Sequence, residues 1–146
     1  MRNESSVMVN RPIDEVWAFM TDPLNIPRLS GATIGIRPSP GQRYPIGVGT
    51  AFQMRMMILG FEARAAAAFT EWDPPRTYAW SGRGAGLRSI SLRETHEAIE
   101  SGTKVVRVVE FEPGPILKLL WPVFGPWFRR RLEASTRNIK RLLEAG

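Results

Sequence analysis

The stretch that decides the fold is PILKLLWPVFGPWFRRRLEASTRNIKRLLEAG, residues 115–146. Its large apolar side chains recur at steps of three and four residues, or at sums of these steps: Leu117, Trp121, Phe124, Phe128, Leu132, Ile139 and Leu142. This spacing places one apolar stripe along one side of a helix. Ser135 and Thr136 occupy the one place in the stripe where a large side chain is missing. The pattern predicts a long amphipathic helix at the end of the sequence.

The beginning of this helix carries residues that oppose a continuous helix. Pro122 and Pro126 each remove a backbone donor, and Gly125 precedes the second proline. The sequence therefore predicts a turn or two at about residues 115–121, a break, and a main helix from about Pro126. Before Arg129 the segment is apolar almost all round, so something must cover its second face. Four candidates would cover this face: the segment 12–29, a partner subunit, a ligand or a membrane surface.

The length and composition are those of a single globular domain, residues 1–146. With 43% hydrophobic and 23% charged residues, the chain is suited to a packed core rather than to general disorder. It has no cysteine, which excludes disulfides, thiol catalysis and thiolate metal sites. The N-terminus lacks the apolar core of a signal peptide, and no run approaches the roughly 18 apolar residues of a membrane span. We therefore expect a cytoplasmic protein.

The net charge of +6 comes largely from arginines near the C-terminus, among them Arg129, Arg130 and Arg131. A basic surface attracts nucleic acid or anionic lipid. Three consecutive arginines spread over roughly 200° of a helix, as an ordinary solvated face does. No familiar nucleic-acid motif accompanies them, so we expect no nucleic-acid partner. A weak contact with a membrane surface, and either a monomer or a dimer, are compatible with the sequence.

The hundred residues before this helix read mostly as strands. Residues 4–10 predict a first strand. Ile13, Val16, Trp17 and Met20 are spaced as one face of a short helix, and a second short helix is predicted within residues 23–29. From residue 32 the apolar period becomes two, which predicts strands at about 32–38, 48–58, 61–71, 76–82, 87–98 and 103–112. The short links between them predict an antiparallel meander.

Short motifs between these elements carry a resemblance to a known family. They are Arg11-Pro12-Ile13-Asp14-Glu15-Val16-Trp17, Thr21-Asp22-Pro23, Val48-Gly49-Thr50, Glu71-Trp72-Asp73-Pro74-Pro75, Gly102-Thr103-Lys104-Val105 and Asn138-Ile139-Lys140-Arg141-Leu142-Leu143-Glu144. In this order they resemble the START-like superfamily (SRPBCC, or Bet v 1-like), and within it the polyketide cyclase/dehydrase-like group. The resemblance covers about residues 4–144.

The resemblance implies an α+β helix-grip fold. In that fold a seven-stranded, curved antiparallel sheet wraps around the long C-terminal helix, two short helices follow the first strand, and an apolar cavity lies between sheet and helix. Members of the superfamily include lipid carriers, plant ligand-binding proteins, aromatic cyclases and dioxygenase subunits. We find no iron-binding His/His/Asp set here, which excludes a dioxygenase catalytic subunit. The fold alone does not determine the function.

The best candidates for chemistry sit on the last two predicted strands. His96 is the only histidine, so we expect no metal site and no cofactor. If strands 87–98 and 103–112 pair through Ser101-Gly102, then Glu94, His96 and Arg107 approach one another. A histidine beside a carboxylate can act as acid or base. The alternative is ordinary cross-strand pairing on the solvent face, because the inward side of strand 103–112 is ambiguous from sequence.

The candidate ligand-binding residues are apolar side chains expected to face the long helix. They are Phe52, Met54, Met56, Phe61, Ala63, Ala65, Ala67, Trp80, Phe111, Trp121, Phe124 and Phe128. The alanines project little from the middle of a strand, which either leaves space for a ligand or lets the helix approach closely. The methionines adapt to varied apolar shapes.

Three hypotheses of function follow. The first is binding of a small hydrophobic ligand, lipid-like, aromatic or polyketide-like, in a cavity between the sheet and the C-terminal helix. The second is an aromatase/cyclase or dehydratase that acts on a polyketide-like substrate through Glu94, His96 and Arg107. The third is docking on a membrane or partner through residues 115–131.

Overall fold

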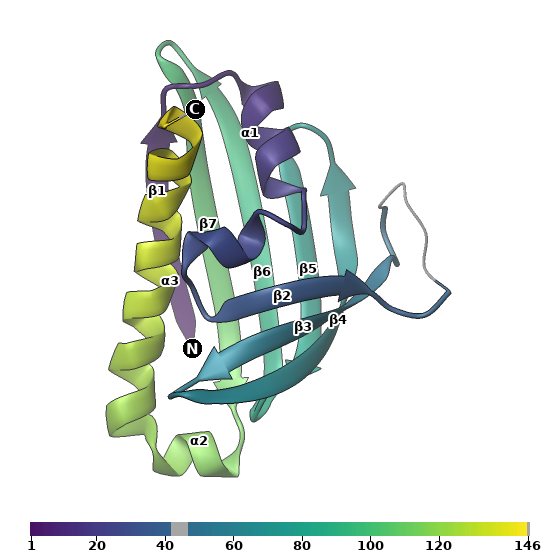
Figure 1. Ribbon diagram of the computed structural model, residues 1–146, viewed down its shortest axis with the longest axis vertical. Coiled ribbons are helices and arrows are strands. Elements are labelled where there is room, and N and C mark those ends of the chain that lie inside the picture. Colours follow the sequence, from purple (N-terminus) through teal and green to yellow (C-terminus); the bar gives the residue numbers. More distant parts are fainter. Residues whose placement is uncertain (42–46, 146) are drawn as a thin grey trace.

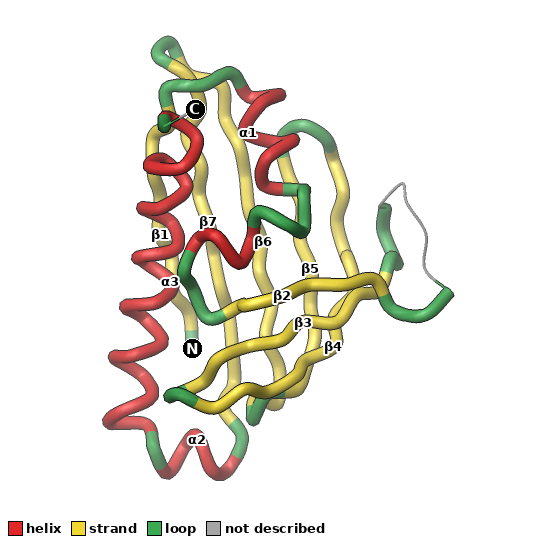
Figure 2. The backbone as a smooth tube through the Cα atoms, in the orientation of Figure 1, coloured by secondary structure: helices red, strands yellow, loops and turns green. Residues whose placement is uncertain are grey.

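A computed structural model describes residues 1–41 and 47–145 of the chain. In chain order the elements are β1 (Arg2–Val9), α1 (Ile13–Met20), the 3₁₀ helix η1 (Ile26–Leu29), β2 (Thr33–Pro38), β3 (Ala51–Ile58), β4 (Phe61–Asp73), β5 (Thr77–Gly84), β6 (Leu87–Ile99), β7 (Gly102–Pro113), α2 (Pro115–Leu119) and α3 (Trp121–Glu144). Figure 2 shows how strands occupy most of the chain between the short helices and α3.

The strands form one antiparallel sheet of seven strands in the order β1-β7-β6-β5-β4-β3-β2. From β2 to β7 each strand pairs with the next, and β1 joins β7 at the far edge. Figure 1 shows β2, β3 and β4 crossing the direction of β5, β6 and β7, so the sheet is strongly curved. The predicted helix-grip fold is confirmed.

Helix α3 packs on β1 and η1 (Figure 1). Its buried face includes Phe124, Phe128 and Ile139, each fully buried. Two polar contacts fix its position: Thr136 Oγ1 lies 2.7 Å from Ser5 Oγ of β1, and Asn138 donates to the Leu29 carbonyl of η1 at 2.8 Å. No helix in the described part of the chain is long and apolar enough to span a membrane.

The long helix begins earlier than the sequence predicts. It starts at Trp121 and contains Pro126, and the break falls at Leu120 rather than before Pro126. Pro122 occupies the first turn, where a backbone N–H has no intrahelical partner, so this proline costs no hydrogen bond. Gly125 lets the Trp121 ring lie against the helix, because a Cβ there would lie 2.8 Å from the ring.

Two glycines at strand junctions give a matched test of backbone packing. Gly102, which begins β7, has φ of 149°, and an added Cβ would lie 2.1 Å from the Val9 carbonyl oxygen. Gly60, between β3 and β4, has φ of 88° with nothing within 4 Å of an added Cβ.

We expect Gly60→Ala to lower the free energy of unfolding by about 1–2 kcal/mol from backbone conformation alone. Gly102→Ala should cost about 1–3 kcal/mol more, because the backbone of β1 must also move. Urea unfolding measures both, and equal losses would contradict this packing at Gly102.

Candidate functional site

A row of polar side chains crosses the inner face of the sheet. Tyr78 of β5 is paired with Glu94 of β6, Glu94 with Arg107 of β7, and Arg107 with Ser5 of β1. Residues directly opposite each other on neighbouring strands point to the same face, so these four side chains form one polar row.

Helix α3 meets the polar row at the gap in its apolar stripe. Arg107 Nη1 donates to Ser135 Oγ at 3.0 Å, and Ser5 Oγ lies 2.7 Å from Thr136 Oγ1. Both α3 residues are buried. Small hydroxyl side chains are therefore present where a large apolar side chain would bury the polar row without partners.

Glu94 is the centre of the polar row and has no exposed surface. Its Oε2 lies 2.6 Å from His96 Nε2, and its Oε1 lies 2.9 Å from Arg107 Nε. The second contact is an ion pair in which the Nε–H is not aligned on the oxygen, so it lacks hydrogen-bond geometry. The guanidinium of Arg107 and the imidazole of His96 offset much of the cost of keeping this carboxylate away from water.

The structure corrects the interpretation that Glu94, His96 and Arg107 pair on the solvent face. Glu94 and His96 are buried, and the Arg107 side chain is only 11% exposed. The register through the turn at Gly102 turns Arg107 inward together with Val105 and Val109, which are buried. The structure therefore brings the three predicted side chains together inside the protein.

Tyr78 joins this cluster, although the sequence analysis did not single it out. It is 4% exposed. Burial raises its pKa well above the ordinary value, and the charge of Glu94 raises it further, while the charge of Arg107 opposes both. Tyr78 therefore keeps its proton at neutral pH and acts as a hydrogen-bond donor. Its inward position follows from sharing strand parity with Trp80, a signal that the sequence did contain.

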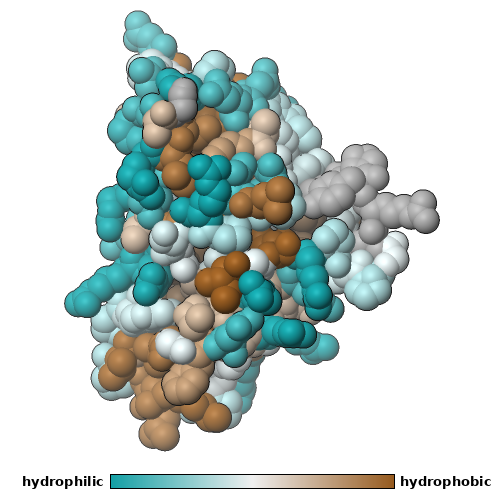
Figure 3. Space-filling model, viewed as in Figure 1, coloured by the Kyte–Doolittle hydropathy of each residue, from teal (hydrophilic) through white to brown (hydrophobic). Residues whose placement is uncertain are grey.

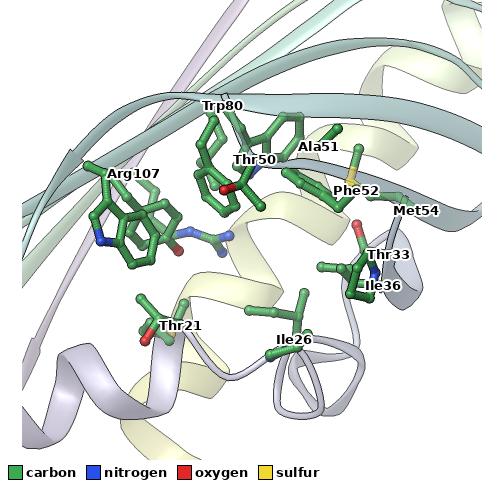
Figure 4. Close-up of a pocket in the computed structure, with 17 residues that line it drawn as sticks. Thr21, Ile26, Thr33, Ile36, Thr50, Ala51, Phe52, Met54, Trp80 and Arg107 are labelled. Carbon is green, nitrogen blue, oxygen red and sulfur yellow. The ribbon is translucent and has the colours of Figure 1, made fainter. Parts of the chain in front are cut away.

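A cavity beside the polar row lies between the sheet and the segment from α1 to η1, with β2 in its wall (Figure 4). It has a volume of about 90 Å³. Its wall is formed by Met20, Thr21, Pro23, Ile26, Thr33, Ile36, Pro38, Thr50, Ala51, Phe52, Met54, Phe69, Trp72, Tyr78, Trp80, Leu92 and Arg107. Among these described residues Arg107 is the one that carries a charge, and Figure 4 shows it reaching in among the aromatic side chains. We call this space the main cavity.

A second cavity of about 50 Å³ lies between the sheet and α3. Phe128, Leu132 and Ser135 are its contributions from α3. The two cavities share part of their walls, namely Ile26, Thr33, Trp80, Leu92 and Arg107. The predicted position between sheet and C-terminal helix thus describes the smaller cavity, whereas no described α3 residue lines the main one.

The aromatic side chains of α3 explain this displacement. Phe128 packs on Phe111 with ring centroids 4.9 Å apart and on Phe124 at 5.1 Å. Trp121 lies 6.1 Å from Phe124 and 6.2 Å from Phe111. These rings fill the space under the beginning of α3, so the larger void remains under the α1–η1 segment.

The predicted ligand-binding residues are divided among the cavity walls, the core and the surface. Phe52, Met54 and Trp80 line the main cavity, and Met56, Trp80 and Phe128 line the second one. The remaining predicted residues line neither cavity: Phe61, Ala63, Ala65, Ala67, Phe111, Trp121 and Phe124. Among these, Phe61 is 77% exposed, while Ala65 and Ala67 are buried opposite Met54 and Phe52.

His96 supports the polar row without reaching a cavity. It lines neither the main nor the second cavity. Its ring packs against Trp17 at 5.7 Å and Tyr78 at 6.4 Å, and its Nδ1 has no hydrogen-bond partner among the described residues. Among residues 1–41 and 47–145 no group of three acidic or imidazole side chains is placed to hold a metal ion.

Several solved structures have the same fold. A protein from Thermus thermophilus, TTHA0849, is 17% identical with a TM-score of 0.77, over 99% of this chain and 97% of that chain. The Zhui aromatase/cyclase from Streptomyces sp. R1128 is 14% identical with a TM-score of 0.79, over 99% and 93%. Ara h 8.0201 is 16% identical with a TM-score of 0.71, over 100% and 99%. At these identities the likeness establishes the fold alone.

A search of curated proteins finds no match. The family described as polyketide cyclase/dehydrase and lipid transport matches residues 2–144, nearly the whole chain. The match agrees with the resemblance found in the short motifs and with the curved sheet around α3. The chain therefore belongs to the polyketide cyclase/dehydrase and lipid transport family.

Proposed function

We propose that the protein binds a small, mainly apolar molecule in the main cavity and holds an oxygen of that molecule with Arg107. The observation that carries this proposal is a charged guanidinium in the wall of a cavity that is otherwise largely apolar and aromatic. Pockets of this composition use apolar walls for affinity and a few polar groups for orientation.

The donors of Arg107 are only partly used by the protein. Nε faces Glu94 and Nη1 donates to Ser135. No hydrogen bond of Nη2 is found among the described residues, although a guanidinium carries five N–H donors. A ligand oxygen at Nη2 would satisfy this group, and the dry surroundings strengthen such a bond.

The size of the main cavity limits what enters without a change in the protein. Its volume of about 90 Å³ is below the roughly 150 Å³ of a cavity known to hold benzene. A single ring therefore already requires some adjustment of the wall. A polyketide-like or lipid-like molecule would have to join the two cavities by moving a shared side chain such as Trp80 or Ile26. The aromatic walls favour a flat ring over an alkyl chain.

An aromatase/cyclase or dehydratase is the second candidate, and Tyr78 is the observation that favours it. Acid–base chemistry requires a titratable group that touches the ligand. Glu94 and His96 do not line the main cavity, whereas Tyr78 does. Because its pKa is raised, Tyr78 is a weaker acid than an ordinary tyrosine, so it suits donation of a hydrogen bond to a carbonyl oxygen and not transfer of its proton. Ligand binding needs only Arg107 and the apolar walls of the main cavity, so we rank ligand binding ahead of catalysis.

The ligand preference can be tested with benzoate and toluene, which differ in the carboxylate. Removing Arg107 alone would leave Glu94 uncompensated, so Glu94→Gln/Arg107→Met replaces both charges. We expect this double variant to bind benzoate at least about tenfold more weakly, with toluene affinity changed by less than about twofold. NMR titration of backbone amides measures both affinities.

The matched control for that experiment is Arg93→Met. Arg93 lies on β6, is 55% exposed and pairs with Glu71 on the surface. The Arg93→Met variant should leave the affinities for benzoate and toluene unchanged. If the double variant kept its benzoate affinity, Arg107 would not hold the ligand. If neither probe bound the native protein in the main cavity, binding there would be refuted.

The raised pKa of Tyr78 predicts a fall in the free energy of unfolding at alkaline pH. Its folded pKa lies above the unfolded value of about 10, so above that pH the unfolded chain releases the proton first. The contribution of the protonated Tyr78 to the free energy of unfolding is complete below about pH 10 and is lost as the pH rises above it. Tyr78→Phe should therefore show a shallower fall of unfolding free energy above about pH 10, by up to about 1.4 kcal/mol per pH unit. Urea unfolding across this range tests the difference, and parallel curves would contradict it.

A further inference from the structure

The corner between α2 and α3 leaves large apolar side chains in solvent. Ile116 is 73% exposed, Leu119 82%, Leu120 42% and Val123 62%. We call these four residues the apolar tip, and Figure 3 shows hydrophobic surface gathered at the end of the molecule where α2 lies. The α1–η1 segment contacts β2, β6, β7 and α3 but leaves this tip uncovered. Contiguous exposed apolar surface of this kind marks an interaction site.

The apolar tip is held outward by an ordered backbone. Leu120 N–H donates to the Ile116 carbonyl at 3.1 Å, and Phe124 N–H donates to the Leu120 carbonyl at 2.8 Å. Leu117 and Phe124 of the same corner point inward and are buried. The corner thus already buries the apolar side chains that the core needs, and the tip is left for another surface.

Basic side chains adjoin the apolar tip in the sequence, and the same stretch lacks acidic ones. Between Glu112 and Glu133 the sequence has no acidic residue, while Lys118, Arg129 and Arg130 are exposed there. The whole of α3 carries six basic and two acidic residues. We call Lys118, Arg129 and Arg130 the basic rim. The apolar tip with this basic rim complements a partner whose outer layer is negatively charged and whose interior is apolar.

We propose that this end of the protein docks on the surface of an anionic lipid bilayer. The apolar tip would enter the boundary between headgroups and acyl chains, while Lys118, Arg129 and Arg130 lie against anionic headgroups. The surface is separate from the main cavity, so docking does not depend on the proposed ligand.

Other partners fit this surface less well. A second copy docked through the same corner would bring both sets of basic side chains together, which like charges oppose. A nucleic acid would meet the basic rim but would leave the four apolar side chains without a counterpart. The anionic bilayer accounts for both features.

The test is flotation with phosphatidylcholine vesicles that contain about one-third phosphatidylserine, at low salt, beside vesicles of phosphatidylcholine alone. The native protein should float with the anionic vesicles. Leu119→Ser should weaken vesicle binding about tenfold or more, because it removes an inserted apolar side chain. Arg130→Gln should weaken it about fivefold. All of these side chains are exposed, so the variants retain the fold.

Matched controls lie elsewhere on the surface. Leu24, between α1 and η1, is 79% exposed, and Leu24→Ser should leave binding unchanged. Arg76→Gln, in the turn between β4 and β5 at the opposite end of β5 from α2, is the corresponding charge control. The proposal is overturned if anionic vesicles fail to carry the protein, or if Leu119→Ser binds as the native protein does. An effect of Arg130→Gln without one of Leu119→Ser would indicate general polyanion binding, as expected for a nucleic acid. A dimer dissociated by Leu119→Ser in analytical ultracentrifugation would assign the tip to a second copy.

Discussion

The ion pair between Glu94 and Arg107 is the constraint on which the interior depends. A carboxylate with no exposed surface is stable only while its partners stay in place, and losing one partner of such a pair costs about 3–5 kcal/mol. The pair therefore links β6 to β7, and the hydrogen bond from Arg107 to Ser135 links these strands to α3. The strand pairing, the position of α3 and the site are thus linked to one another through this contact.

The same contact makes the interior suited to binding. Glu94 occupies one side of the Arg107 guanidinium, Ser135 a second, and the rest meets the main cavity. Tyr78 adds a neutral donor beside it, since burial keeps its pKa high. An apolar wall with this polar corner orients a molecule by its oxygen while burying the rest. The aromatic rings of α3 leave the larger cavity on the opposite side, under α1 and η1.

Much of the fold could be predicted because it follows from local periodicity. The strand segments match the structure closely, and so does the apolar stripe of α3, except that Leu143 is buried where the sequence predicts Leu142. The gap at Ser135 and Thr136 marks where the polar row lies. What could not be predicted depends on long-range geometry. The inward side of β7 depends on the turn at Gly102, and the cavity wall between Met20 and Ile36 depends on how that segment folds over the sheet. The early start of α3 required knowing that Pro122 would fall in a first turn.

The most direct test of the account is a crystal structure of the native protein with benzoate. We expect the carboxylate within about 3 Å of Arg107 Nη2, with the ring against Phe52 and Trp80 in the main cavity. The Glu94–Arg107 contact should remain intact beneath it. Benzoate bound elsewhere, with Arg107 Nη2 bonded to the protein and the main cavity filled by side chains, would contradict it.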